Sequence, residues 1–222
     1  MKNKVVIFDL DGTLLNTLGD LADACNYALS KRGLPTHSVE KYKNFVGWGI
    51  TTLIELSLPE DLRNNESVIR DVKEDVTEYY GLHWNVKTKP YDGIVEVLKS
   101  FKENNIRMAV LSNKPQEFTE ITVNYFFPEK YFFAVEGAKG KILKPMKEAL
   151  EPIFSKIGEL ENAFIFFVGD SKIDMETAKA GNIFPVGVSW GFRDSDELLK
   201  SGAKFIAHSP SKLKNYILEF NT

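Results

Sequence analysis

Two aspartates separated by one residue follow a short apolar run near the start of the chain. Asp9 and Asp11 come directly after residues 5–8, which have the composition of a buried strand. Where a strand ends and the chain leaves a sheet, both carboxylates can line one crevice. Carboxylates this close repel each other unless a cation or a shared proton lies between them. The pair therefore predicts a site for a hard divalent metal such as Mg²⁺, which binds carboxylates and keeps positions for phosphate oxygens.

Gly12 and Thr13 complete this first segment, and a second acidic strand end lies far along the chain. Gly12 allows a tight turn or a close approach of the backbone to an anion. Taken alone, the first segment could also be a surface turn, because Asp-Gly is a common turn dipeptide. The apolar run 163–168 leads to Asp170, with Asp174 one helical turn later. This second strand end favours the metal site, although Asp174 could instead cap the helix that it begins.

A hydroxyl and an ammonium group are predicted at two further strand ends. Ser112 and Asn113 follow the apolar run 106–111, and their hydroxyl and backbone N–H groups suit an anionic oxygen, although either residue could simply cap the next helix. Lys144 follows a glycine-bearing loop and could balance the charge on a phosphoryl group during transfer. The same loop carries two other lysines that could take this role, Lys139 and Lys141.

The composition excludes several classes of protein. The chain has 222 residues, of which 43% are hydrophobic, and 28 basic against 31 acidic side chains. These values are ordinary for a folded globular protein, and the dispersed basic residues exclude a general nucleic-acid binder. The longest apolar run, 163–168, is far shorter than the roughly 20 residues that a membrane span needs. Cys25 is the single cysteine, so no internal disulfide can form and we expect a cytoplasmic location.

The elements that must position these residues follow an alternating pattern. Five runs have the length and composition of strands buried on both faces, at 5–8, 106–111, 131–135, 163–168 and 183–188. Segments with helical character separate most of them, at 93–103, 115–125, 146–157 and 171–180, the last expected to end in a left-handed cap at Gly181. The alternation predicts an α/β fold with a doubly wound, Rossmann-like parallel sheet.

The alternation fails between the first strand and residue 106, where the pattern is helical. One apolar stripe ends at Gly33 and another at Gly81. We expect an inserted all-helical cap domain at 14–84, with the α/β core formed by 1–13 and 85–222. Within the cap, Gly47 and Trp48 could bring backbone and indole against a ligand, although a turn between helices with a partly buried indole fits equally well.

The four polar segments, in this order and spacing, resemble the motifs of the haloacid dehalogenase-like superfamily: Asp9-x-Asp11-Gly12-Thr13, Ser112-Asn113-Lys114, Lys144-Pro145 and Gly169-Asp170-x-x-x-Asp174. A helical insertion directly after the first motif is similar to the phosphoglycolate phosphatase group of that superfamily. The resemblance implies that Asp9 is a nucleophile that becomes an aspartyl phosphate. It also implies that Asp11 protonates the leaving alcohol and later activates water.

The resemblance also implies roles for the remaining residues. Ser112 and the backbone near Asn113 would hold phosphate oxygens, and Lys144 would offset the charge around them. The residues expected to contact substrate are Gly12, Thr13, Asn113, Gly47 and Trp48. The residues expected to bind Mg²⁺ are Asp9, Asp11 through its carbonyl, Asp170 and, in support, Asp174. On the cap, Lys41 and Lys43 could meet a substrate carboxylate, but a solvated helix face accounts for them as well.

A phosphatase is the function that these residues favour. Expelling an alkoxide needs a proton donor such as Asp11, whereas expelling a halide does not, so a phosphate ester is favoured over a haloacid. We expect a Mg²⁺-dependent phosphatase of a small phosphorylated metabolite, with 2-phosphoglycolate the first choice. The alternatives are a sugar phosphomutase or pyrophosphatase of the same fold and, in another class, a phosphoacceptor signalling module. We expect no nucleic-acid or membrane partner, and a monomer or homodimer.

Overall fold

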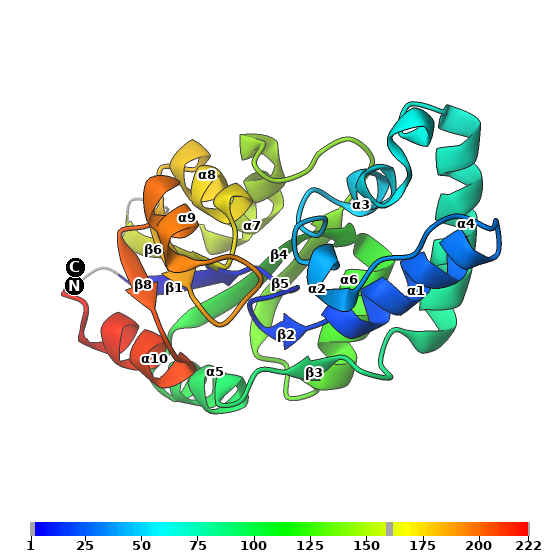
Figure 1. The fold of residues 1–222 in the computed structure, drawn as a ribbon. Coiled ribbons are helices and arrows are strands. Elements are labelled where there is room, and N and C mark those ends of the chain that lie inside the picture. Colours follow the sequence, from blue (N-terminus) through cyan, green and yellow to red (C-terminus); the bar gives the residue numbers. More distant parts are fainter. Residues whose placement is uncertain (1–2, 159–161, 222) are drawn as a thin grey trace.

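A computed structural model describes residues 3–158 and 162–221, and the centre of this described chain is a six-stranded parallel sheet (Figure 1). Its order is β5-β4-β1-β6-β7-β8. The strands are β1 (Asn3–Phe8), β4 (Arg107–Pro115), β5 (Phe132–Ala138), β6 (Ala163–Gly169), β7 (Phe184–Val188) and β8 (Phe205–Ala207). β1 pairs with β4 on one side and with β6 on the other, so its carboxyl end lies at the middle of the sheet.

Helices cover both faces of this sheet. They are α5 (Ile94–Glu103), α6 (Gln116–Phe126), η2 (Lys147–Leu150), α7 (Glu151–Ile157), α8 (Lys172–Ala180), α9 (Ser195–Lys200) and α10 (Pro210–Glu219). Val6 and Phe8 of β1 pack in one apolar cluster with α5 and α10, whereas Val5 and Ile7 pack in another with α7 and α8. Because β1 is covered on both faces, its residues 5–8 are apolar on both sides of the sheet. The predicted doubly wound, Rossmann-like sheet is confirmed.

The inserted helices form a separate body beside the carboxyl edge of the sheet (Figure 1). They are α1 (Leu18–Ser30), α2 (Val39–Tyr42), α3 (Ile50–Ser57), η1 (Glu60–Leu62) and α4 (Glu66–His83). Their apolar faces share one hydrophobic cluster, distinct from the two clusters that flank the sheet. The inserted all-helical cap is therefore confirmed. No helix in the described ranges is long and apolar enough to cross a bilayer.

A short antiparallel ribbon joins cap and core. β2 (Leu15–Asn16) pairs with β3 (Lys89–Pro90) where the chain enters and leaves the insertion. The buried Asp20 carboxylate, in the first turn of α1, accepts hydrogen bonds from the backbone N–H and the hydroxyl of Thr88 at 2.8 and 2.7 Å. The two chain passages are thus tied together, while the cap bounds 14–84 stay a prediction.

Two predicted helix ends differ from the structure. Gly181 has a right-handed conformation with φ −82°, and the left-handed residue is Asn182, with φ +52°. Asparagine tolerates this region better than most side chains, so the cap moves one residue along. Gly81 does not end its helix, because α4 continues to His83. β8 was not predicted, because a three-residue strand is too short to leave a pattern in the sequence.

Candidate active site

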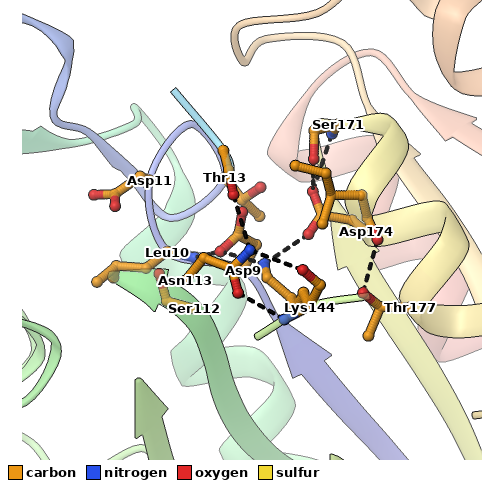
Figure 2. A network of polar contacts seen from close by, with 12 residues as sticks. Asp9, Leu10, Asp11, Thr13, Ser112, Asn113, Lys144, Ser171, Asp174 and Thr177 are labelled. Carbon is orange, nitrogen blue, oxygen red and sulfur yellow. Dashed lines mark hydrogen bonds and ion pairs between the residues drawn. The ribbon is translucent and has the colours of Figure 1, made fainter. Parts of the chain in front are cut away.

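The carboxyl ends of three adjacent strands bring the predicted polar residues together (Figure 2). Asp9 follows β1, Ser112 lies near the end of β4, and Asp170 follows β6. From β1 the chain builds the sheet first toward β4 and later toward β6, which makes this edge the switch point where doubly wound sheets bind ligands. Lys144 reaches the same place from the loop after β5.

A buried ammonium bridges two of the carboxylates. The Lys144 Nζ atom lies 2.8 Å from Asp9 Oδ1 and 2.7 Å from Asp174 Oδ1. The Leu10 backbone N–H also donates to Asp9 Oδ1, at 2.7 Å, and among the described residues no group hydrogen-bonds to the other oxygen, Oδ2. One Asp9 oxygen is therefore fixed in place while the other is available to a ligand. Lys139 pairs instead with Glu136, so Lys144 is the loop lysine at the site.

Asp174 caps the start of a helix and also contacts the lysine of the site. Its Oδ2 atom accepts hydrogen bonds from the Ser171 backbone N–H at 3.0 Å and from the Ser171 hydroxyl at 2.6 Å. These bonds form a capping box at the start of α8. Oδ1 of the same carboxylate accepts from Lys144. The two interpretations that the sequence left open for Asp174, helix cap and site support, therefore describe two oxygens of one side chain.

Asp170 is held by groups from two other loops. Its Oδ1 accepts from the Thr13 hydroxyl at 3.0 Å, and its Oδ2 from the Phe192 backbone N–H at 2.8 Å. Gly12 adopts φ +87°, and a Cβ atom there would collide with the Asp170 carboxylate. The glycine thus lets the first loop pass directly over Asp170. Gly12 and Thr13 are placed beside this carboxylate and do not line the adjoining cavity.

Three buried carboxylates face one ammonium here, and their pKa values reflect the excess of negative charge. Burial and the neighbouring Asp174 raise the pKa of Asp9 well above its ordinary range, although Lys144 lowers it in part. Burial and Asp174 raise the pKa of Asp170 to about 7, against hydrogen bonds that lower it. Burial lowers the pKa of Lys144, but Asp174 and Asp9 outweigh this effect and keep the ammonium charged.

The donor set fits a divalent metal. One carboxylate oxygen from each of Asp9, Asp170 and Asp174 lies within 4.8 Å of the others, and all three residues are buried. Clustered carboxylate oxygens are the ligands that Mg²⁺ prefers, and added positive charge would relieve the repulsion that raises the pKa values of Asp9 and Asp170. The Asp11 side chain lies outside this group and points away from it (Figure 2).

Asp11 pairs instead with a lysine of the second motif. Lys114 Nζ lies 3.2 and 3.4 Å from the two Asp11 carboxylate oxygens. The ammonium also lies over the Tyr80 ring of α4, 4.6 Å from its centroid. Burial lowers the pKa of Lys114, but the Asp11 carboxylate raises it above its usual value. Lys114 is thus a buried cation between the acid/base candidate of the core and a helix of the cap.

Asn113 and Arg193 attach the cap to this edge. The Asn113 amide donates to the carbonyls of Gly47 and Lys144 at 3.0 and 3.1 Å, and its oxygen accepts from the Lys144 backbone N–H at 2.7 Å. Arg193, in the loop after β7, donates to the carbonyl of Lys43 and, at 3.1 Å, to that of Val46. Both side chains therefore hold the cap segment that precedes α3.

A cavity lies between this segment and the strand ends. From the core it is lined by most of the predicted site residues, Asp9, Asp11, Ser112, Asn113, Lys144 and Asp170. From the cap it is lined by Leu21, Val46, Gly47, Gly49, Ile50 and Leu53. Gly47 lines the cavity, whereas Trp48 is 41% exposed and does not; contact of either residue with substrate stays a prediction.

Comparison with known proteins agrees with this geometry. Residues 6–188 match the model of the haloacid dehalogenase-like hydrolase family. The chain belongs to this family. It is 29% identical over 215 residues to a phosphoglycolate phosphatase of Vibrio parahaemolyticus, covering 95% of this chain and 94% of that protein. It is 30% identical over 210 residues to one of Haemophilus influenzae, covering 91% of this chain and 93% of that protein.

A solved structure from Lactobacillus delbrueckii, itself a predicted phosphoglycolate phosphatase, matches this haloacid dehalogenase-like chain with a TM-score of 0.89. The two are 32% identical, and the match covers 99% of this chain and 100% of that one. The predicted superfamily and its phosphoglycolate phosphatase-like group are confirmed. The expected enzyme class, a phosphoric monoester hydrolase, is confirmed at the level of this family.

Two residues of this haloacid dehalogenase-like site were given no role from the sequence. Lys114 stands in the second motif, but its contact with Asp11 depends on how the end of β4 turns. Arg193 follows the glycine-bearing segment after β7, and its two cap carbonyls lie about 150 residues earlier in the chain. Neither contact leaves a local pattern. A lysine inside a recognised motif was nevertheless a signal that could have been followed.

Proposed function

We propose that this hydrolase is a Mg²⁺-dependent phosphatase that cleaves a small phosphate monoester through an aspartyl phosphate on Asp9. One observation carries the proposal: the Asp9 carboxylate opens into the cavity with one oxygen held by Lys144 and Leu10 and the other free of protein hydrogen bonds in the described chain. A carboxylate fixed in this way can approach phosphorus in line.

The two acidic residues of the first motif divide the reaction between them. The free Asp9 oxygen attacks phosphorus while the bond to the leaving alkoxide breaks, and Asp11 gives that alkoxide its proton. Asp11 then takes a proton from water as the water oxygen attacks phosphorus. The bond between phosphorus and the Asp9 oxygen breaks, which releases phosphate and restores the Asp9 carboxylate. For the first step the Asp11 side chain must turn from Lys114 toward the leaving oxygen.

The remaining groups of the site bind and balance charge. The Ser112 hydroxyl lines the cavity, and its oxygen accepts from the Lys114 backbone N–H at 3.2 Å, which leaves its own proton for a phosphate oxygen. Lys144 offsets negative charge beside Asp9 throughout. The Asn113 side chain is already hydrogen-bonded to Lys144 and Gly47. We therefore expect Asn113 to contact substrate through its backbone alone.

The residues that would hold Mg²⁺ are Asp9, Asp170 and the carbonyl of Asp11. Asp174 would support them, since both of its oxygens are already engaged by Lys144 and Ser171. When bound, the ion supplies positive charge that stabilises the transferring phosphoryl group and lets the carboxylates stay ionised.

The relatives support 2-phosphoglycolate as the first substrate to test, because both curated matches are phosphoglycolate phosphatases over nearly their full lengths. A cytoplasmic location and a monomeric or homodimeric state also belong to this proposal.

The test measures phosphate release from p-nitrophenyl phosphate, 2-phosphoglycolate and a panel of phosphorylated metabolites, with Mg²⁺ and with EDTA. Asp9→Asn should lower kcat roughly 10³-fold or more, and EDTA should abolish turnover until Mg²⁺ is restored. Asp196→Asn, at an exposed position on α9, is the matched control and should leave turnover unchanged. Activity that survives both Asp9→Asn and metal removal would refute the proposal. Isomerised sugar phosphate without free phosphate would indicate a mutase instead.

A further inference from the structure

Three cationic side chains line the cavity in the described chain, and two of them each contact groups on two other segments. Lys144 is held between Asp9 and Asp174 at 2.8 and 2.7 Å. Arg193 donates to two cap carbonyls and lies 3.5 Å from Glu197. Lys144 is thus committed to the carboxylates around Asp9, and Arg193 to the attachment of the cap. The third cation, Lys114, is bound differently.

Lys114 keeps unused hydrogen-bonding capacity. An ammonium has three donors, and the Lys114 Nζ atom interacts with the Asp11 carboxylate and with the Tyr80 side chain. The distances of 3.2 and 3.4 Å are longer than the roughly 2.7–2.9 Å of a tight charge-assisted bond. The side chain is only 4% exposed, so water does little to compensate. A ligand with a second anionic group could therefore form a tighter ion pair with this ammonium.

The surroundings of Lys114 are built to hold a charge. The Tyr80 ring of α4 lies against the ammonium and contributes a cation–π contact. The Tyr80 hydroxyl is buried and also interacts with the Lys114 side chain. Tyr80 therefore helps to hold the Lys114 ammonium at the boundary between core and cap.

The cap provides no alternative cation. The cavity surface that it contributes consists of apolar side chains and glycines. Lys43 pairs with Glu40 at 2.7 Å, and Lys41 contacts His37 at 3.2 Å; neither lines the cavity. A substrate carboxylate against this apolar surface would be desolvated without compensation unless it reached Lys114.

We propose that Lys114 is the specificity-determining residue of this site, and that it pairs with a carboxylate on the leaving group of a small phosphorylated hydroxy acid. The inference rests on the proposed phosphatase function and names the substrate class of that site. It replaces the cap lysines as the partner of the carboxylate with a lysine of the core. It also makes Lys114 a group that touches substrate, beyond any effect on Asp11.

The experiment compares two alkyl phosphates that differ in the carboxylate, 2-phosphoglycolate and 2-hydroxyethyl phosphate. For the wild type we expect a higher kcat/KM on 2-phosphoglycolate. Lys114→Met should lower the ratio of the two kcat/KM values about 100-fold, chiefly through KM for 2-phosphoglycolate, because a site built to pair a polar group discriminates strongly. Lys114→Arg should keep part of the preference. Lys41→Met is the matched control and should leave the ratio unchanged.

Three outcomes would overturn the inference: a wild type that does not prefer the carboxylate, a Lys114→Met ratio equal to that of the wild type, or an equal loss on both substrates, which would mean that Lys114 only positions Asp11. If Lys114→Met does not fold, Lys114→Gln carries the same comparison. Failure of the proposed function is a separate result, because the wild type would then release no phosphate from either compound or from p-nitrophenyl phosphate.

Discussion

The two sides of the cavity differ in kind. The core side contributes polar and charged groups, which come from strand ends and from the loop after β5: Asp9, Asp11, Ser112, Lys114, Lys144 and Asp170. The cap side contributes apolar side chains and glycines: Leu21, Val46, Gly47, Gly49, Ile50 and Leu53. Charge chemistry is thus confined to the part of the molecule that a parallel sheet makes rigid. The cap supplies shape and excludes water.

Because of this difference, the core side carries the reacting groups and the cap controls access to the cavity. The groups of the core side are held by short contacts, such as those of Lys144 with Asp9 and Asp174 at 2.8 and 2.7 Å. The cap is joined to the core by the β2–β3 ribbon and by the hydrogen bonds of Asn113 and Arg193. We therefore expect substitutions of the reacting groups Asp9 and Asp11 to act on kcat and substitutions at the cap attachment to act on KM.

Beyond the loss expected for Asp9→Asn, the largest effect should come from Asp11→Asn on the core side. Without a proton donor, kcat on an alkyl phosphate should fall by about 10²–10⁴-fold, because that is the usual contribution of a general acid. The loss on p-nitrophenyl phosphate should be much smaller in the first step, since nitrophenolate leaves without a proton. Steady-state and burst kinetics on both substrates measure this difference.

An equal loss of the burst phase on both substrates would contradict the acid role of Asp11 and would indicate that the Asp11–Lys114 pair is structural. Asp92→Asn, an exposed position in the turn before α5, is the control. It should change neither substrate.

A smaller effect should follow from loosening the cap with Arg193→Met. The variant loses the hydrogen bonds to the Lys43 and Val46 carbonyls, so KM should rise about tenfold, equivalent to about 1.4 kcal/mol, with a lesser change in kcat. Arg63→Met is the matched control, because Arg63 also binds backbone carbonyls but only within the cap. If Arg193→Met lowers kcat and leaves KM unchanged, the division between reaction and access is wrong.

Much of the site could be predicted because parallel strands end at one edge. Asp9, Ser112 and Asp170 each follow or finish an apolar run, and the topology alone brings such positions together. The role of Lys144 was harder to predict, because Lys139 and Lys141 lie in the same loop. Which lysine reaches the site depends on where the loop turns back to Asp9. The side-chain direction of Asp11 depends on Lys114, which no spacing rule predicts.

The fold shows the same limit. Long apolar runs predicted the central strands, whereas β8 is too short to be recognised and Asn182 takes the left-handed position expected for Gly181. Apolar stripes with helical spacing predicted the cap. They did not predict how the cap attaches to the core, because the Arg193 and Asn113 contacts join segments distant in sequence. Trp48 illustrates the result: its neighbour Gly47 lines the cavity and the indole does not.

The smallest expected effect is on stability. It tests whether the buried carboxylates of the core side carry an excess of negative charge. The pKa of Asp170 is raised to about 7, from an ordinary value of 3.8, by burial and by Asp174, and the pKa of Asp9 is raised as well. The native state therefore binds more protons than the unfolded state between these values. It follows that, without metal, the free energy of unfolding falls as pH rises from about 4 through about 7.

In EDTA, Tm should consequently be several degrees higher at pH 5.5 than at pH 8. One pKa unit corresponds to about 1.4 kcal/mol, and the Tm of a domain of this size shifts by roughly 2–4 °C per kcal/mol. Asp170→Asn removes one titrating carboxylate and should flatten this slope. Mg²⁺ should do so in the wild type by stabilising the ionised cluster, most strongly at pH 8. A Tm in EDTA that rises between pH 5.5 and 8 would mean that the core side is not short of positive charge. The case for a metal among Asp9, Asp170 and Asp174 would then lose its electrostatic basis.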